Sequence, residues 1–191
     1  MAYVKENFHF ITKMLLNQFG AAFMGLMLSL SVSVSDNNTL VLLSAIFSMI
    51  FYLCLQYMVM WDLGARDIIR VNGKRDKYRP LCGLRMSLVA NIPNIILAVL
   101  ICVGHIFGSE TGAFGYGWAG KLYVISKGIA VVWEAMYNGF VQLYSPHNPI
   151  IYILMILPAL FAGTAGYYLG TKNFRILGLF GFKQKPPKNG K

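Results

Sequence analysis

Charged residues are absent from four long stretches of this chain. No Asp, Glu, Lys or Arg occurs in residues 14–35, 37–61, 86–109 or 148–171, and each stretch has at least 22 residues. A helix of about 20 apolar residues crosses the ~30 Å hydrocarbon core of a bilayer, whereas a helix in a soluble core keeps a charged face. The absence excludes a soluble globular fold. It predicts an all-α integral membrane protein with four transmembrane helices, at about 14–35, 39–61, 86–108 and 148–170.

Cysteine, histidine and catalytic motifs are also scarce. The three cysteines, Cys54, Cys82 and Cys102, are odd in number and lack metal or redox spacing, so they indicate neither a disulfide framework nor a zinc site. Three histidines are too few for a His-rich ligand set. The chain has no HExxH pair, no Gly-x-Ser-x-Gly elbow and no phosphate-binding glycine loop. These absences favour a protein that is not an enzyme and that needs no metal or cofactor.

Lysine and arginine gather in three segments. The N-terminal segment holds two, the 62–85 loop seven and the tail after residue 171 six, which leaves only Lys121 and Lys127 of the 17. Cytoplasmic segments retain basic residues, so we expect a plasma-membrane protein with both termini and the 62–85 loop in the cytoplasm. Residues 1–171 are then one polytopic membrane domain, and residues 172–191 form a basic cytoplasmic tail. The even number of crossings implies that 110–147 does not span the bilayer.

Residues 121–144 carry the pattern of an amphipathic helix. Such a pattern with aromatic residues is typical of a helix that lies in the outer interface or re-enters the membrane partway. A fifth crossing is the alternative, and it would leave the basic tail outside. The apolar face consists of Leu122, Ile125, Ile129, Val132, Met136, Phe140 and Leu143, and the polar stripe consists of Lys127, Glu134, Asn138 and Gln142.

Small residues recur at helical spacing in the first and last spans. Helices in lipid approach each other closely where small residues face one another. We therefore expect these two spans to pack tightly, either with each other or with a partner subunit. The residues concerned are Ala21, Gly25 and Ser29 in the first span and Gly163, Gly166 and Gly170 in the last.

Proline and asparagine interrupt the third span. Pro93 removes a backbone donor and predicts a kink, as Pro158 does in the last span. Asn91 and Asn94 lie three residues apart and can bond the freed carbonyls or a neighbouring helix. One interpretation is structural, polar contacts at a kink. The other is a ligand path lined by Asn91, Asn94, Gln56 and Glu134.

The 62–85 loop mixes both signs of charge. The order Asp62, Arg66, Asp67, Arg70 suits a short helix with i, i+4 ion pairs. Basic residues near a bilayer also attract anionic lipids, so we expect lipid contact or docking of a cytoplasmic partner here. Nucleic-acid binding is not expected, because membrane orientation accounts for the basic residues. The residues are Arg66, Arg70, Lys74, Arg75, Lys77 and Arg79.

The same loop partly resembles the signature of CDP-alcohol phosphatidyltransferases, which implies a metal pair held by four aspartates around Gly and Ala-Arg. Asp62, Gly64, Ala65, Arg66, Gly73 and Asp76 follow that order. The gaps differ from the signature and at least one aspartate is missing, and two divalent ions need several carboxylates at fixed spacing. A lipid-modifying enzyme is therefore the third hypothesis.

In size and composition the chain also resembles the substrate-binding membrane subunits of energy-coupling-factor vitamin transporters. Those proteins have six spans and an Ala-x-x-x-Ala contact, where this chain has four expected spans and Ala21 to Gly25; we assign no family. The leading hypothesis is a non-enzymatic membrane subunit or accessory of a larger assembly, with partner subunits or further copies of itself. The alternative is a carrier or channel for a small neutral or amphipathic solute.

Overall fold

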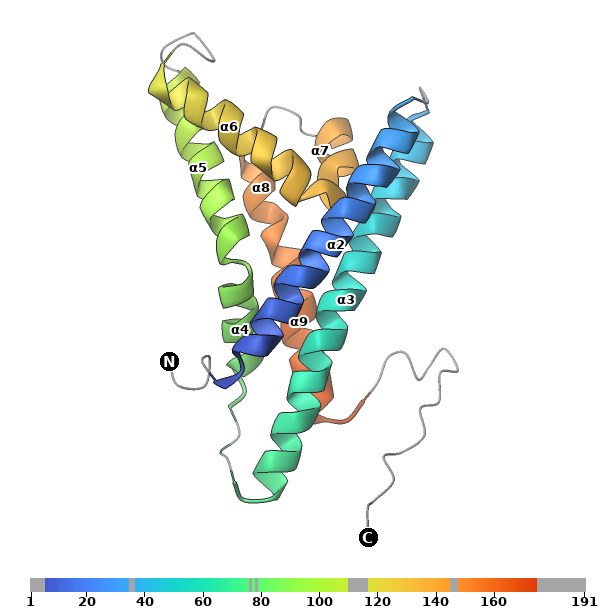
Figure 1. Cartoon of the computed structure of the whole chain (residues 1–191), viewed down its shortest axis with the longest axis vertical. Coiled ribbons are helices and arrows are strands. Elements are labelled where there is room, and N and C mark those ends of the chain that lie inside the picture. The colour runs from blue at the N-terminus through green and yellow to red at the C-terminus, as the bar shows by residue number, and fades with distance from the viewer. Residues whose placement is uncertain are drawn as a thin grey trace.

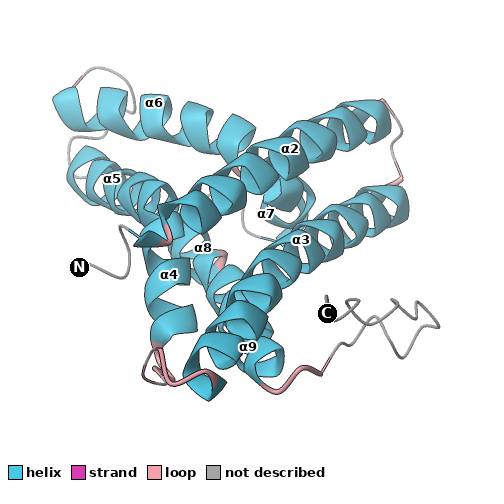
Figure 2. Ribbon diagram, turned by 60° about the horizontal axis from the view of Figure 1, so that its bottom comes forward, coloured by secondary structure: helices cyan, strands magenta, loops and turns pink. Residues whose placement is uncertain are grey.

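A computed structural model describes residues 6–34, 37–75, 77, 79–109, 117–144 and 148–174 (Figure 1). In these ranges every secondary-structure element is a helix, and no strand occurs. Figure 2 shows the helices gathered in one bundle. The prediction of an all-α membrane protein is confirmed.

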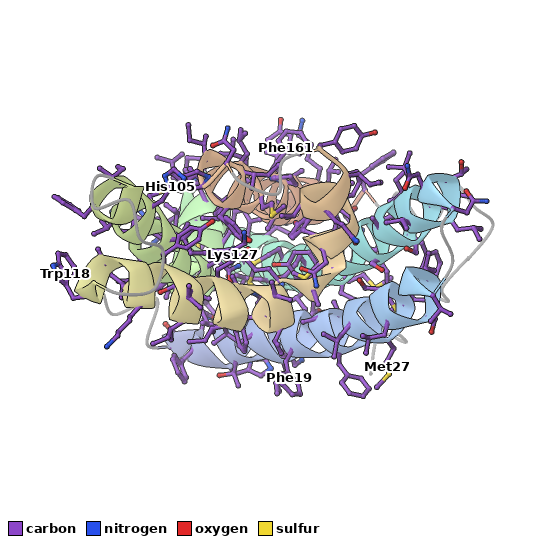
Figure 3. The ribbon with its side chains drawn as sticks, turned by 90° about the horizontal axis from the view of Figure 1, so that it is seen from above. Phe19, Met27, His105, Trp118, Lys127 and Phe161 are labelled. Carbon is purple, nitrogen blue, oxygen red and sulfur yellow. The ribbon has the colours of Figure 1, made fainter. Side chains whose placement is uncertain are left out.

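Three helices are long and apolar enough to cross a membrane, and a bent pair makes up to four. They are α2 (Phe8–Ser33), α3 (Asn38–Asn72), the run of α8 (Ile150–Leu154) and α9 (Ile156–Thr171), and the pair α4 (Cys82–Ala90) and α5 (Ile92–Ser109). Their exposed residues are largely apolar, as a lipid-facing surface requires. Phe19, Met27 and Phe161 point outward when the bundle is seen from above (Figure 3).

The kink predicted at Pro93 divides the third span. The axes of α4 and α5 meet at 58° around Asn91. Pro93 cannot donate a backbone hydrogen bond, so the helix opens one turn before it. The Asn91 side chain bonds the carbonyl of Ser87 at 2.8 Å. In the last span the break between α8 and α9 falls at Met155, three residues before Pro158, where the same physical cause applies.

The helix α3 corrects the predicted boundary of the second span. That span was expected to end near Trp61, but the helix continues to Asn72, so the first half of the 62–85 loop is helical. Two contacts explain the extension. Asp62 and Arg66 form an i, i+4 ion pair at 3.4 Å, and Gly64 lets the backbone of α9 lie directly against α3. Because α9 packs against it, α3 can continue beyond its charge-free stretch.

The predicted helix 121–144 is broken at Glu134. It consists of α6 (Trp118–Trp133), the 3₁₀ turn η1 (Ala135–Tyr137) and α7 (Asn138–Tyr144). In Figure 1, α6 runs from the end of α5 down into the bundle, and α7 returns toward the same end. The structure therefore has a helical hairpin, as in the re-entrant interpretation. We call residues 118–144 the hairpin.

The tip of the hairpin reaches well into the bundle. A β-carbon added at Gly25 would lie 2.6 Å from the backbone nitrogen of Met136, so η1 rests directly on α2 at this glycine. Gly25 lies eight residues before the end of α2 at Ser33, which is about 12 Å along a helix axis. The tip is therefore at membrane depth if α2 spans the bilayer.

The apolar face of α6 points outward, as expected for a helix in contact with lipid. Ile125, Ile129 and Val132 of the predicted apolar face are 62%, 52% and 59% exposed. Glu134 of the polar stripe is 3% exposed, and Lys127 is half-buried. Apolar side chains gain nothing by leaving a hydrocarbon solvent, whereas polar ones gain by finding partners. Lys127 and Glu134 of the polar stripe consequently face the interior, whereas Gln142 is exposed.

The small-residue stripes pack inside this chain. α9 lies along α3, where β-carbons at Gly166 and Gly170 would collide with the carbonyl oxygens of Tyr57 and Trp61. Gly163 faces Ser87 of α4, and Ala21 is fully buried. The last span thus packs against the second and third spans, and the stripe of the first span is used against the hairpin.

One end of the bundle collects the segments that were predicted to be cytoplasmic. Arg70 pairs with Glu6 at 3.1 Å, the Tyr167 hydroxyl donates to the carbonyl of Arg79 at 3.3 Å, and the Trp61 indole donates to the carbonyl of Phe174 at 2.8 Å. The predicted basic tail lies outside the described residues from 175 on. These contacts place three distant segments at one end, and which side of the membrane it faces stays a prediction.

That prediction can be tested with single cysteines in a background lacking Cys54, Cys82 and Cys102. Arg75→Cys and Lys172→Cys are expected to resist an impermeant thiol reagent in intact cells, and Asn37→Cys at the opposite end is expected to react. Lysed cells, in which all three should react, provide the control. Labelling of Lys172→Cys but not Arg75→Cys in intact cells would contradict the shared end.

Candidate functional site

Four side chains from three parts of the chain form a buried hydrogen-bond network. Asn94 is its centre: its side-chain oxygen accepts from Gln18 of α2 at 2.6 Å and from the Trp133 indole of α6 at 2.8 Å. Its amide nitrogen donates to Asn91 at 2.9 Å. Gln18, Asn91 and Asn94 are each no more than 4% exposed. The network joins α2, α5 and α6 at the bend between α4 and α5.

Gln56 connects α3 to α2 by a separate contact. Its side-chain nitrogen donates to the carbonyl of Met14 at 3.1 Å, and the residue is 1% exposed. Met14 lies one turn before Gln18 on the same helix. Three of the four residues predicted to line a ligand path therefore hold helices together, and their known partners belong to this chain.

The fourth residue, Glu134, lies at the tip of the hairpin in a different environment. Its carboxyl interacts electrostatically with the hydroxyls of Tyr52, Tyr137 and Tyr152, from α3, η1 and α8. One carboxyl oxygen and the hydroxyls of Tyr137 and Tyr152 have no hydrogen-bond partner among the described residues.

An open pocket lies between the hairpin and helices α2 and α8. We call it the hairpin pocket, and its volume is about 260 Å³. Lys127 points toward the middle of the bundle in the view from above, while Trp118 of the same helix points outward (Figure 3). The lining residues are Ser29 of α2, Lys127 and Val131 of α6, Asn138, Val141 and Gln142 of α7, and Tyr152 of α8.

The lysine in this pocket is held by a tyrosine of its own helix. Its ammonium lies 3.2 Å from the Tyr123 hydroxyl and 5.4 Å from the centre of that ring. An i, i+4 pair on one helix face places the two side chains together. The contact orients the ammonium on the interior side of α6, where the sequence shows no other basic residue between Lys121 and the end of the hairpin.

The structure separates residues that sequence reasoning had grouped. Asn91, Asn94 and Gln56 do not line the hairpin pocket, whereas Lys127, Asn138 and Gln142 of the polar stripe do. Ser29, expected only as a packing residue, is also part of its wall. Tyr152 was missed, because its sequence neighbours are apolar and only the bundle brings it to the hairpin. The polar stripe was the signal that could have located this site.

Two arginines of the basic segment after Trp61 are paired within the chain. Arg66 and Arg70 pair with Asp62 and Glu6, and Asp67 accepts from the Tyr167 hydroxyl at 2.9 Å while 8% exposed. Lys74 adopts a left-handed backbone conformation in the connection to α4. Within the described ranges, no group of three His, Cys, Asp or Glu side chains is arranged to hold a metal ion.

Comparisons with protein-family models, with curated proteins and with solved structures find no match to this chain.

Proposed function

We propose that this membrane protein is a non-enzymatic carrier that binds a small solute in the hairpin pocket. The observation that carries the proposal is the pocket itself: polar residues, among them Ser29, Lys127 and two amides, line one opening of about 260 Å³ between the hairpin and helices α2 and α8. Polar groups at membrane depth are costly and are mostly found where they pair or face a substrate path. The pocket is smaller than the ~300–1,000 Å³ of sites for drug-sized ligands, so a metabolite-sized solute fits it.

Two features of the backbone support a carrier over a purely structural role. The third span bends by 58° at Asn91, and the hairpin enters the bundle without crossing it (Figure 1). Broken helices near the midplane are the usual construction of solute sites in secondary transporters. Irregular backbone at this depth is tolerated where protein buries it or where it lines a cavity. Here the bend adjoins the hairpin through the bond between Trp133 and Asn94.

The buried network beside the pocket would block access to the solute site from one side of the membrane. Gln18, Asn91, Asn94 and Trp133 tie α2, α5 and α6 together, and Gln56 adds a tie between α3 and α2. A carrier exposes its site to one side at a time, so one set of contacts must seal the other side. We infer that this network is the seal, and that the hairpin pocket opens at the end of the bundle where α5 and α6 are connected.

The test uses two neighbouring valines on α6. Val131 lines the hairpin pocket and Val132 faces outward, so Val131→Trp should fill the pocket while Val132→Trp should not. The protein is extracted gently from its native membrane, and bound small molecules are identified by mass spectrometry. We expect one solute class with the unchanged protein and with Val132→Trp, and its loss with Val131→Trp at equal monodispersity. Absence of any stoichiometric solute from the unchanged protein would refute the proposal.

A membrane subunit of a larger assembly is the second candidate, and one observation favours it. Ile69 is 71% exposed and Leu81 is 60% exposed, both beyond the charge-free stretches and next to basic residues. An apolar patch that is exposed to water and rimmed by polar residues is typical of a contact site for a partner, and we propose that these two residues belong to such a patch. Ile69→Glu should then remove a protein that co-purifies with the unchanged chain. The small-residue stripes no longer support this candidate, because they are used within the chain.

A further inference from the structure

We propose that the Glu134 carboxyl is a proton-binding site, protonated while the tip of the hairpin lies in the bundle and ionised when the tip leaves it. The tip consists of residues 134–137. The inference rests on the proposed function and deepens it, since it makes the carrier proton-coupled. It starts from burial: Glu134 is 3% exposed, and one of its carboxyl oxygens has no hydrogen-bond partner among the described residues. An ionisable residue at membrane depth is typical of a proton or ion path.

The end of helix α6 opposes a negative charge at this position. The helix ends at Trp133, and Glu134 is its C-terminal cap. The C-terminus of a helix has a partial negative charge, which repels a carboxylate and attracts a proton or another cation. Secondary transporters commonly place such helix ends, inside the membrane, at the site of the coupling ion. The break in the hairpin therefore puts the acid where a bound proton removes an unfavourable charge.

The charged groups around the tip do not neutralise the acid. Among the described residues, no cationic side chain forms an ion pair with Glu134. On α6 the nearest basic residue in the sequence is Lys127, seven positions earlier, which is about 10 Å along a helix axis. Its ammonium lies 3.2 Å from the Tyr123 hydroxyl. Helices α2 and α7 meet the tip with uncharged residues, Gly25 and Asn138.

Three tyrosine hydroxyls surround the acid. They come from α3, η1 and α8, interact electrostatically with its carboxyl, and have no hydrogen-bond partner among the described residues. A hydroxyl can accept from a carboxylic acid and can donate to a carboxylate, so these groups suit both forms. All three are fully buried, and exchange of the proton therefore requires that water reaches the tip. They belong to Tyr52, Tyr137 and Tyr152.

The contacts of the hairpin couple proton release to displacement of the tip. The 3₁₀ turn η1 rests on α2 at Gly25, and Gly139 of α7 lies against Ala45 of α3. Both are packing contacts between close backbones. When the tip leaves, the O–H bond of the acid breaks, the proton passes to water and the carboxylate becomes hydrated. When the tip returns, the carboxylate takes a proton from water before it is buried, because an unpaired buried charge is costly.

The first measurement detects the proton itself. The purified full-length protein in lipid nanodiscs is titrated between pH 6 and pH 10, and infrared difference spectra record the stretch of a protonated carboxyl. Glu134→Gln is the test variant, and Glu6→Gln, at a 60% exposed acid paired with Arg70, is the matched control. We expect a carboxyl band that is lost with rising pH in the unchanged protein and in Glu6→Gln. Glu134→Gln should lack this band at every pH.

The second measurement reports the position of the tip. Ala135 is 2% exposed, so Ala135→Cys in a background without the native cysteines should react with a small thiol reagent only when the tip leaves. We expect its labelling to rise as the carboxyl band is lost, and to stay low at the same pH when Glu134→Gln is also present. Ala98→Cys on α5, at a residue that is 1% exposed, should stay unreactive throughout.

Each other result overturns the inference. If Glu134→Gln leaves the band unchanged, or if no band titrates, Glu134 does not bind the proton. If the band titrates but labelling of Ala135→Cys is the same with and without Glu134→Gln, the acid is not linked to the tip. A midpoint that moves with Na⁺ concentration at constant ionic strength would identify Na⁺ as the bound cation. Should Glu134→Gln not fold, Glu134→Asp replaces it, and an unchanged midpoint would place the titrating group elsewhere.

The two measurements are independent of the proposed function, because neither involves a solute. If the band and the labelling fail while Val131→Trp still removes a bound solute, the carrier stands without proton coupling. If no solute is recovered while the band and the labelling hold, the carrier is wrong, and the coupling of the proton to a solute is wrong with it.

Discussion

Gly166→Ala is expected to lower the melting temperature of the detergent-solubilised protein by on the order of 5–10 °C, or to prevent its folding. The new methyl group would lie 2.6 Å from the carbonyl oxygen of Tyr57 and 3.3 Å from the side chain of Met60. The oxygen belongs to helix α3, whose backbone cannot shift alone, so the whole α3 and α9 contact must open. Overpacking of this kind typically costs ~1–3 kcal/mol, and one kcal/mol corresponds to about 2–4 °C for a chain of this size.

The control for this prediction is Gly20→Ala on α2. No atom outside the local backbone lies within 4 Å of the position where its β-carbon would be. Alanine is favoured over glycine inside a helix by up to ~1 kcal/mol, so Gly20→Ala should raise the melting temperature slightly or leave it unchanged. Equal effects of the two substitutions, measured by the loss of monomer on size exclusion after heating, would show that α9 does not pack on α3 as described.

Asn94→Leu is expected to destabilise the protein by about 2–5 kcal/mol. The substitution removes the acceptor shared by Gln18 and Trp133, which leaves one buried and one partly buried donor without it. A buried polar group that loses its partner costs ~1–3 kcal/mol. The expected loss of stability is large because the side-chain oxygen of Asn94 accepts two hydrogen bonds. Thermal unfolding followed by tryptophan fluorescence would measure it.

A double-mutant cycle sharpens this second prediction. Gln18→Leu combined with Asn94→Leu should cost less than the sum of the two single changes, because the pair removes a donor and its acceptor together. Asn17→Leu is the control on α2, since Asn17 is half-buried and makes one long contact of 3.5 Å to the carbonyl of Leu55. It should cost much less than Asn94→Leu. Additive effects of the first pair would rule out the bond between α2 and α5.

The charge-free stretches were sufficient to predict a membrane protein, because bilayer thickness sets the length of apolar sequence that each spanning helix needs. That length can be read from each segment by itself. The end of α3 was not predictable in the same way. Its continuation past Trp61 depends on α9, which lies against Gly64 and is about a hundred residues away in the sequence. The local sequence pattern shows which part of a helix must be apolar. How far α3 continues beyond that part depends on its packing against α9.

The hairpin pocket was only half visible in the sequence. Its polar stripe on residues 121–144 was recognised, because seven- and four-residue spacing identifies one helix face. The break at Glu134 was not, since it depends on Gly25 receiving the tip of the hairpin. Asn91 and Asn94 were placed on a ligand path as one of two interpretations, and the structure shows them bonded to Ser87, Gln18 and Trp133. A polar residue in a spanning helix can bond another residue of the chain or a ligand, and the sequence alone does not distinguish the two.

The bond between Gln18 and Asn94 also sets an order for the synthesis of this protein. The two residues are 76 positions apart, and a ribosome adds ~5–20 residues per second. For about 4–15 s after Gln18 is made, its partner does not exist, and Trp133 follows later still. The first helix must therefore enter the membrane on its apolar residues alone. The Gln18 side chain can form its hydrogen bond to Asn94 only after the third span has been made and inserted.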